Sequence, residues 1–172
     1  ADWCTGATAT NRCLIRVMPG TYALDAMLNI PPFMDVEGQG AENTVISRTS
    51  GSASNTLAAV LRMHNDTSLR RVTIRNTGGD TAVSMGVIAR ANASPNTGPV
   101  DLAEVTIDVS GATNSNFGVY AKYALNVSIT DSTISAHLGV AASCLYTFGV
   151  HGTDQTNGAS LDITRSRITV SG

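Results

Sequence analysis

Two acidic residues of this chain occupy the same position in a repeated four-residue sequence motif, where a pair of carboxylates could act in catalysis. Glu104 opens the phrase "EVTI" and Asp131 opens "DSTI", while arginines open the matching phrases "RVTI" at Arg71 and "RSRI" at Arg165. Two carboxylates about 5 Å apart are the catalytic groups of retaining glycoside hydrolysis. Arginines beside them, with Arg167 as a further cation, can hold the carboxylate of an acidic sugar. If the fold stacks these phrases, they form a candidate site for cleaving an acidic polysaccharide.

The same charges have a second interpretation, in which they hold stacked strands together. Alignment of the repeats places opposite charges side by side, and such cross-strand pairs contribute roughly 0.2 to 1 kcal/mol each, whereas like charges destabilise. Each acid of the repeat would then already have a basic partner, and the charges would reject wrong registers. The ion pairs predicted on this basis are Arg71/Glu104, Arg75/Asp108 and Asp131/Arg165. We favour this structural interpretation and keep the catalytic one as the alternative.

No metal or cofactor site is predicted. His64, His137 and His151 are too scattered in the sequence to suggest zinc, whose ligands usually come at short, defined spacings. His151 follows a Gly-Val strand and precedes a polar turn, and it is expected to be an ordinary surface residue. The turn "GTDQTNG" (152–158) has a single acid, and calcium loops generally need more oxygen ligands and more charge.

The three cysteines leave the disulfide state open. Cys4 and Cys13 lie nine residues apart and could close a short N-terminal loop. Cys144 is far from both, and an odd thiol in a secreted protein can pair between chains. In the alternative, all three are unlinked and pack as small hydrophobic residues.

The elements that must position these residues are short β-strands. From Leu14 onward, short pieces that alternate apolar and polar residues are separated by Gly, Asn, Pro, Ser or Asp, which is typical of strands joined by turns. A period of 20 to 50 residues is typical of solenoids. The isoleucines that anchor the repeat recur after 33, 27 and 34 residues, at Ile74, Ile107, Ile134 and Ile168. Gly-Val pairs lie between these anchors, at Gly86, Gly118 and Gly149, so each period holds about three strands.

This pattern predicts an all-β chain folded as a parallel β-helix. Three short strands per coil, with aliphatic residues stacked inside and few aromatics, give about five coils over residues 14–172. Residues 1–13 are expected to form an N-terminal cap or linker.

The run from Arg16 to Ser47 carries a family resemblance. "RVMPGTYALDAMLNIPPFMDVEGQGAENTVIS" resembles the first coil of right-handed parallel β-helix proteins of the pectate lyase-like superfamily, where "PGTY", an apolar strand, "GQG" and "TVI" occur in this order. The resemblance covers residues 14–172 and implies the fold. It implies no single activity, because this architecture serves lyases, hydrolases, esterases, tailspikes, adhesins and inert rods.

The catalytic motifs of three enzyme groups with this fold are not matched. "NTGGD", "GVHG" and "RIT" are near misses to polygalacturonase motifs and lack the acids that carry the chemistry. The pectin methylesterase arrangement of two aspartates beside an arginine and the pectate lyase strand Trp-Ile-Asp-His are also missing. None of these activities is carried over to this chain.

Composition limits the partners. The 172 residues carry a formal charge of -2, with no basic stripe to follow a nucleic-acid backbone and no apolar run of the ~20 residues that a membrane helix needs. We expect a secreted, extracellular or cell-surface protein, without nucleic acid, membrane span or cofactor.

The expected function is structural. A β-helix has two open ends that invite further strands, so we expect end-to-end assembly into a homo-oligomer or polymer, or a place in a longer surface or filament protein. The alternatives are a carbohydrate-active enzyme that uses Glu104 and Asp131, and a polysaccharide-binding tailspike or adhesin that uses Thr, Asn and the tyrosines Tyr120 and Tyr123.

Overall fold

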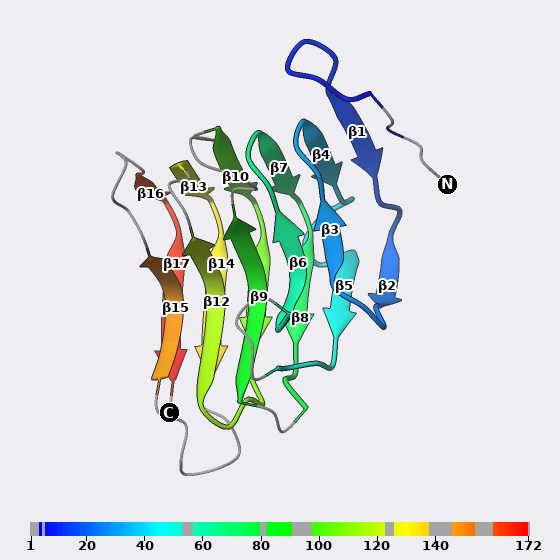
Figure 1. The fold of residues 1–172 in the computed structure, drawn as a ribbon. Helices are drawn as coiled ribbons and strands as arrows, with labels where there is room; N and C mark the ends of the chain where they lie inside the picture. The colour runs from blue at the N-terminus through cyan, green and yellow to red at the C-terminus, as the bar shows by residue number, and fades with distance from the viewer. Residues whose placement is uncertain are drawn as a thin grey trace.

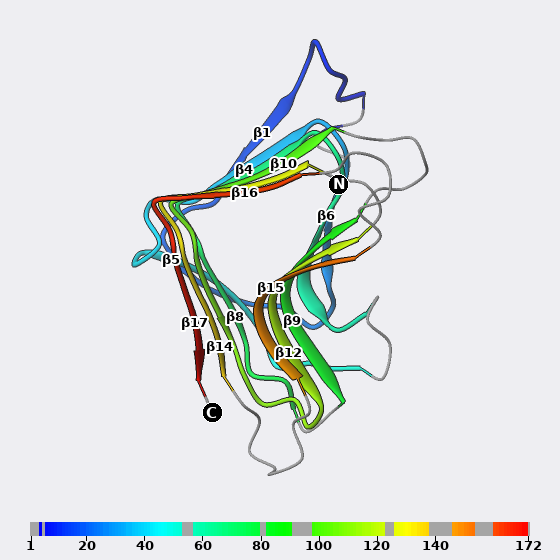
Figure 2. The same cartoon turned by 90° about the vertical axis from the view of Figure 1, so that its left-hand side faces the viewer.

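The chain forms three parallel β-sheets wound into one solenoid. The computed structural model describes residues 4, 6–52, 57–79, 82–90, 98–122, 126–137, 146–153 and 160–171. Every third strand along the chain joins the same sheet, and all the strand pairs between neighbouring coils are parallel. The strands lie side by side along the solenoid axis (Figure 1), and the view along this axis shows a three-sided cross-section (Figure 2). The predicted parallel β-helix with three strands per coil is confirmed.

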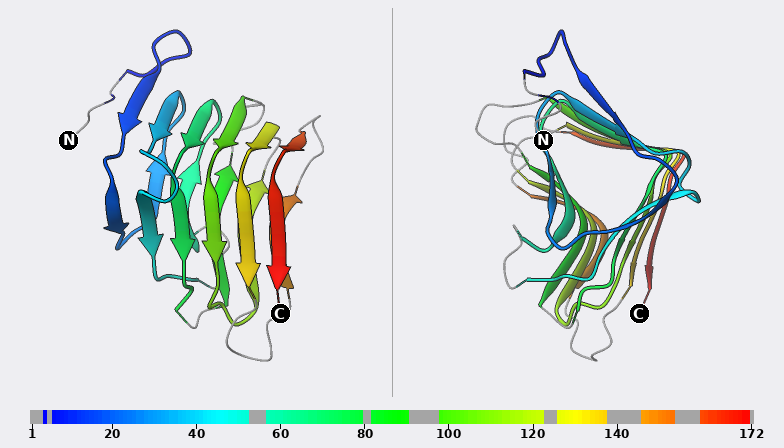
Figure 3. Two further views of the ribbon diagram at one scale, coloured as in Figure 1. Left: turned by 180° about the vertical axis from the view of Figure 1, so that it is seen from behind. Right: turned by 90° about the vertical axis from the view of Figure 1, so that its right-hand side faces the viewer.

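The strands of the three sheets, in chain order, are as follows. The first sheet contains β1 (Cys13–Arg16), β4 (Met34–Glu37), β7 (Thr67–Arg70), β10 (Pro99–Ala103), β13 (Asn126–Thr130) and β16 (Leu161–Thr164). The second contains β2 (Gly20–Ala23), β5 (Thr44–Arg48), β8 (Thr73–Asn76), β11 (Thr106–Val109), β14 (Thr133–His137) and β17 (Arg167–Ser171). The third contains β3 (Leu28–Ile30), β6 (Ala59–Met63), β9 (Val83–Arg90), β12 (Ser115–Lys122) and β15 (Tyr146–Thr153). The three sheets, of six, six and five strands, make five to six coils. The left-hand view of Figure 3 shows the solenoid from behind. No helix in the described ranges is long and apolar enough to cross a membrane.

The predicted isoleucine column forms the centre of the second sheet. Ile74 pairs with Ile107, Ile107 with Ile134, and Ile134 with Ile168. The first three are fully buried, whereas Ile168 in the last described coil is 38% exposed. Burial of a full aliphatic side chain contributes about 1.5 to 3 kcal/mol, so this column and its counterparts on the other sheets set the register.

The Gly-Val pairs mark a bend in the third sheet where the backbone passes close to the core. Val87, Val119 and Val150 are in register, as predicted. A Cβ added at Gly86 would clash with Cγ2 of Ile107 and would lie 2.7 Å from the carbonyl oxygen of Gly118. Glycine is therefore required at Gly86 by close packing.

A buried asparagine joins the second sheet to the third. Asn76 is fully buried, and its Nδ2 donates to the carbonyl oxygens of Ala58 (3.0 Å) and Met85 (2.8 Å). Its Oδ1 accepts from the backbone N–H of Gly78 (3.2 Å) and of Ser50 (3.3 Å). One side chain thus satisfies four backbone groups at the corner of the coil.

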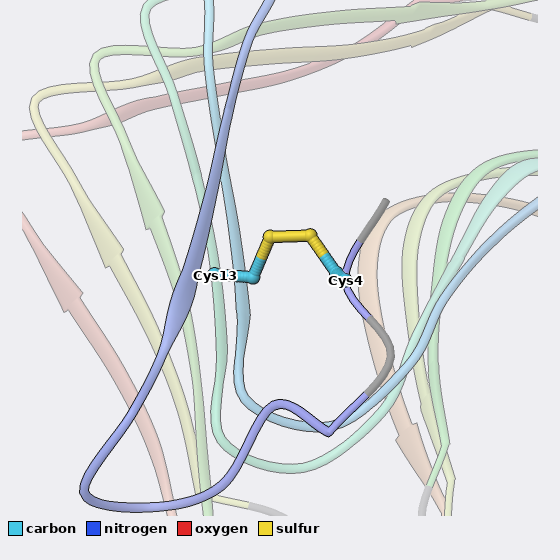
Figure 4. The surroundings of a disulfide bond; sticks show 2 residues. All are labelled: Cys4 and Cys13. Carbon is cyan, nitrogen blue, oxygen red and sulfur yellow. A yellow bond between two sulfur atoms is a disulfide. The ribbon is translucent and has the colours of Figure 1, made fainter. Parts of the chain in front are cut away.

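The N-terminal segment is closed by a disulfide. Cys4 and Cys13 are bonded, with their Cα atoms 5.9 Å apart (Figure 4), which is one of the two states that the sequence left open. Strand β1 begins at Cys13 and pairs with β4, so the bridge ties the loop before β1 to the first sheet. Cys144 lies outside the described residues.

An ion pair anchors the first coil, and its contribution to stability depends on pH. Arg12 holds Asp35 through Nε–Oδ2 (2.9 Å) and Nη2–Oδ1 (2.6 Å), and the hydroxyl of Ser68 donates to the same carboxylate (2.6 Å). The hydrogen bond from Arg12 is the main cause that lowers the pKa of Asp35 below its usual range. A carboxyl group whose pKa is lower in the folded state stabilises the fold above its unfolded pKa of about 4 and loses that contribution as the pH falls through the folded value.

We therefore expect Asp35→Asn to lower the free energy of unfolding by about 1 kcal/mol at pH 6, since the partly exposed arginine is screened by solvent. The difference from wild type should shrink as the pH falls below about 4. Urea denaturation at a series of pH values measures it. Asp25→Asn, at an exposed carboxylate, is the matched control and should show no such trend. A difference that stays constant from pH 6 to pH 2.5 would contradict the role of the ion pair.

Candidate functional site

The four charged residues of the repeat form one column at the turns between the first and second sheets. This turn column consists of Arg71, Glu104, Asp131 and Arg165, and all four adopt a left-handed backbone, with φ of 57°, 54°, 50° and 47°. The backbone N–H of Glu104 donates to Thr130 of the next coil (3.0 Å). Non-glycine residues seldom occupy this region, which costs roughly 1 to 2 kcal/mol, least for Asn and Asp. The sequence pattern predicted the column but not its backbone conformation.

Ion pairs in and beside the turn column agree with two of the three predicted pairs. Arg165 donates two hydrogen bonds to the carboxylate of Asp131, from Nε to Oδ1 (2.6 Å) and from Nη2 to Oδ2 (2.7 Å). Arg75 contacts Asp108 at 3.5 Å. The predicted Arg71/Glu104 pair is wrong, because Arg71 turns the other way along the column.

Arg71 instead reaches back to the preceding coil. Its Nη1 lies 3.3 Å from Oε1 of Glu37, at the end of β4. Among the described residues, the Glu104 carboxylate has no hydrogen bond or ion pair. It is thus the acid of the column that is open to a ligand.

A shallow hollow of about 300 Å³ lies over three residues of the turn column. Its outer wall is the turn Gln39–Glu42, which is held in place by a hydrogen bond from the hydroxyl of Thr73 to the carbonyl oxygen of Ala41 (2.6 Å). This contact buries Thr73, although its position directly before the inward Ile74 turns its side chain outward from the coil. The lining residues are Gln39, Gly40, Ala41, Glu42, Arg71, Glu104, Val105, Thr106, Asp131 and Thr133. Arg165 contacts Asp131 from outside this set.

The outer wall of the hollow contributes two polar side chains, Gln39 and Glu42, that sequence reasoning did not select as site residues. Gln39 and Glu42 belong to the "GQGAEN" segment, part of which carried the family resemblance. Their side chains join the site because the turn folds back over the second sheet, a contact between different coils that repeat alignment does not reveal.

The chemistry of the hollow suits a polar, uncharged ligand. It brings together the carboxylates of Glu42, Glu104 and Asp131, one guanidinium and the hydroxyls of Thr106 and Thr133. Three carboxylates beside one paired arginine repel a uronate and favour the hydroxyl groups of a neutral sugar. The hydrogen bond from Arg165 is the main cause that lowers the pKa of Asp131, so this carboxylate stays ionised at neutral pH. Glycoside hydrolysis on this pair would need Glu104 as the proton donor.

The other predicted candidates fall elsewhere. Arg167 is exposed on β17. His64 is buried, with Nε2 2.8 Å from Oδ1 of Asn29, and burial lowers its pKa so that the imidazole is neutral at pH 7. Tyr123 and the side chain of His151 lie outside the described part of the structure. Within that part, no group of three or more His, Cys, Asp or Glu residues could hold a metal ion.

The prediction of Tyr120 as a surface residue for glycan binding is wrong. Tyr120 is only 5% exposed and packs edge-to-face on Phe117, with ring centroids 5.3 Å apart. Both belong to a second hydrophobic cluster, outside the coil, with Ile88 and Met85. Strand β12 bends at Gly118. As a result, the outward-facing apolar side chains of the third sheet pack on one another and are buried, as the inward-facing ones are.

Comparisons with known proteins identify the fold. No protein-family profile and no curated protein sequence matches the chain. Among solved structures, the chain is similar to pectin methylesterase PemA from Erwinia chrysanthemi, at 15% sequence identity and a TM-score of 0.54. The match covers 97% of this chain and 58% of that structure. The chain therefore shares the right-handed parallel β-helix fold of that structure, and at this identity the similarity shows the fold alone.

Proposed function

We propose that the chain is an extracellular structural or adhesive module, without enzymatic activity on polysaccharides, whose coil ends bind further coils. These coils come from a second copy of the chain or from a longer solenoid of which it is a part. The observation that carries the proposal is an apolar surface on the last described coil. Its residues continue the buried columns of the coil before it: Leu161, Ile163, Ile168 and Val170 are 39%, 42%, 38% and 52% exposed, and their register partners Val127, Ile129, Ile134 and Ala136 are buried.

The first coil offers a matching surface at the other end. Its exposed apolar residues include Tyr22 (39%) on the second sheet and Leu28 (40%) on the third, and their register partners Ile46 and Leu61 are buried. A parallel coil stacked about 4.8 Å from either end would cover such residues and pair the open strand edges. Because the two ends differ, repeated contact of this kind is heterologous and builds a filament rather than a closed dimer.

Two further features support this proposal. The Cys4–Cys13 disulfide fits an oxidising, extracellular setting, since disulfides persist there and are rare in the cytosol. Asp131, one of the two acids needed for the enzymatic alternative, is already bound by Arg165 across neighbouring coils. That contact gives this acid a structural use.

Assembly is tested by negative-stain electron microscopy and light scattering of the purified chain, with and without reductant. We expect elongated particles whose mass grows with protein concentration. Ile168→Lys, which places a charge in the open column, should abolish this growth, whereas Thr169→Lys on the outward side of the same strand should not. A monodisperse monomer at about 100 μM, or equal behaviour of the two variants, would overturn the proposal. Loss of particles on reduction would show that assembly depends on a disulfide, either the Cys4–Cys13 bridge beside the first coil or an intermolecular one.

The enzymatic or glycan-binding alternative is favoured by one observation, the hollow over Glu104 and Asp131. Glu104→Asn and Asp131→Asn separate the two functions cleanly, because Asn tolerates the left-handed backbone. For a structural module we expect Glu104→Asn to raise the free energy of unfolding by up to about 1 kcal/mol, and Asp131→Asn to lower it through loss of the Arg165 contact. Thermal unfolding measures both.

Neither wild type nor variant should cleave or bind neutral or acidic polysaccharides if the module is structural. Polysaccharide cleavage by the wild type that is lost in both variants, with their folds intact, would establish the enzyme instead. Binding without cleavage, weakened by either substitution, would establish a glycan-binding module.

A further inference from the structure

A serine, a histidine and an aspartate are joined across three neighbouring strands on the outer face of the second sheet. The Ser171 Oγ on β17 lies 2.7 Å from Nδ1 of His137 on β14. The Nε2 of the same imidazole lies 3.1 Å from Oδ1 of Asp108 on β11. The other oxygen of this carboxylate, Oδ2, lies 3.5 Å from Nε of Arg75 on β8. The parallel register sets this alignment, because His137 pairs with Ser171 directly and reaches Asp108 diagonally across the strand pair.

The contacts fix which atom of the imidazole carries the proton. An ionised carboxylate can only accept a hydrogen bond, so in the neutral form of the imidazole Nε2 carries the proton and donates it to Asp108. Nδ1 then holds a lone pair and accepts from the hydroxyl of Ser171. The serine proton thus points at a base whose orientation is held by an acid, which is the arrangement of an activated nucleophile.

We propose that Ser171 is a nucleophile for activated carboxylic esters, with His137 as its general base and Asp108 as the positioning residue. Ser171 Oγ forms a bond to the ester carbonyl carbon while its proton passes to Nδ1 of His137. The ester C–O bond then breaks, and the alcohol or phenol leaves with that proton. Water hydrolyses the acyl-serine to the free acid and restores the hydroxyl group.

The surroundings define the substrate class. His137 and Asp108 are about two-fifths and one-third exposed, and Ser171 is exposed on the sheet face. Such an open face suits a small acyl group with a good leaving group, such as an aryl acetate. The site is independent of the assembly proposed above, because stacking covers the coil ends, whereas these side chains project from the outer face of the sheet.

Covalent labelling tests the proposal directly. The purified chain is treated with an alkyl fluorophosphonate and mapped by peptide mass spectrometry, and hydrolysis of p-nitrophenyl acetate is followed in parallel. We expect one adduct, on Ser171, and a rate that falls at least tenfold in Ser171→Ala and in His137→Gln, since general-base catalysis contributes about 10²- to 10⁴-fold. The double variant should be no slower than either single variant, because the two groups act as a unit. Ser135→Ala, a neighbouring hydroxyl on the same face and in register with Asp108, is the control and should retain label and rate.

The role of Asp108 has its own readout. In Asp108→Asn the ¹⁵N chemical shifts of the His137 ring should show a mixture of tautomers, together with a lower rate of labelling. Absence of an adduct on Ser171, or adducts spread equally over several serines, would overturn the proposal. So would a hydrolysis rate that depends on His137 but not on Ser171, because the imidazole would then act alone.

Discussion

Asn76→Asp is expected to destabilise the fold by about 4 kcal/mol at pH 7, although it changes a single atom type. The amide nitrogen of Asn76 donates to the carbonyl oxygens of Ala58 and Met85, and a carboxylate oxygen in its place can only repel them. Each buried acceptor left without a donor costs about 1 to 3 kcal/mol, and the buried negative charge adds to this. The two bonds that Oδ1 accepts would remain.

The destabilisation should depend on pH in a direction set by burial. Desolvation raises the pKa of the introduced carboxyl group in the folded state above its unfolded value of about 4. The penalty is therefore smallest well below pH 4, where the group is protonated in both states, and grows as the pH rises from the unfolded pKa to the folded pKa. Urea denaturation at about pH 3, 5.5 and 7 measures this trend.

A matched substitution controls for the change in net charge. Asn114 lies in an exposed turn, so Asn114→Asp should change the free energy of unfolding by less than about 0.5 kcal/mol at every pH. If Asn76→Asp were equally mild at pH 7, the buried amide would not be holding the corner between the second and third sheets.

The parts of the fold that the sequence predicts are those that repeat with the coil. The isoleucine anchors are in register because each coil needs an aliphatic residue inside. The Gly-Val pairs are in register because each coil needs a residue without a side chain at the bend. Alternation of period two also identifies the outward positions, so the Arg75/Asp108 and Asp131/Arg165 pairs follow from alignment alone.

The errors arise where one coil differs from its neighbours. Arg71 pairs with Glu37 because Glu37 ends β4 in the preceding coil, outside the phrases that were aligned. Tyr120 is buried because the third sheet carries a second layer of apolar residues on its outer side. Thr73 is buried by the Gln39–Glu42 turn, which projects over the second sheet, whereas the corresponding corners described at residues 71–72, 104–105, 131–132 and 165–166 are only two residues long.

At both candidate sites, the hollow over the turn column and the Ser171–His137–Asp108 group, the residues that follow the repeat could be predicted from the sequence, and the residues outside it could not. The turn column was predictable, since its members share one position of the repeat, whereas the wall of the hollow comes from an irregular segment. His137 looked isolated in the sequence because Ser171 lies 34 residues away. The coil between β14 and β17 is 34 residues long and therefore places Ser171 beside His137. The sequence carries a signal for this contact, because Ile134 and Ile168 of the repeat have the same 34-residue spacing.

Gly86→Ala is expected to lower the free energy of unfolding by about 3 kcal/mol. The added methyl group would clash with Cγ2 of Ile107 on the second sheet and would lie 2.7 Å from the carbonyl oxygen of Gly118 in the next coil. The backbone at Gly118 cannot move without disturbing the pairing of β9 with β12, so the strain is not relieved locally. Overpacking of a filled core typically costs about 1 to 3 kcal/mol, and a clash with backbone lies at the upper end of that range. Urea denaturation followed by circular dichroism measures the loss.

Ser84→Ala, two residues earlier on the same strand, is the control for Gly86→Ala because it removes a buried atom instead of adding one. Among the described residues the Ser84 hydroxyl has no hydrogen-bond partner, so its removal should leave the stability unchanged or raise it by up to about 1 kcal/mol. If the two substitutions changed the free energy of unfolding in opposite directions, the cause would be lack of space at the bend of β9 and not a general intolerance of substitution in this strand. If Gly86→Ala were as mild as Ser84→Ala, the recurrence of glycine before each valine would need a cause other than the close approach of neighbouring coils.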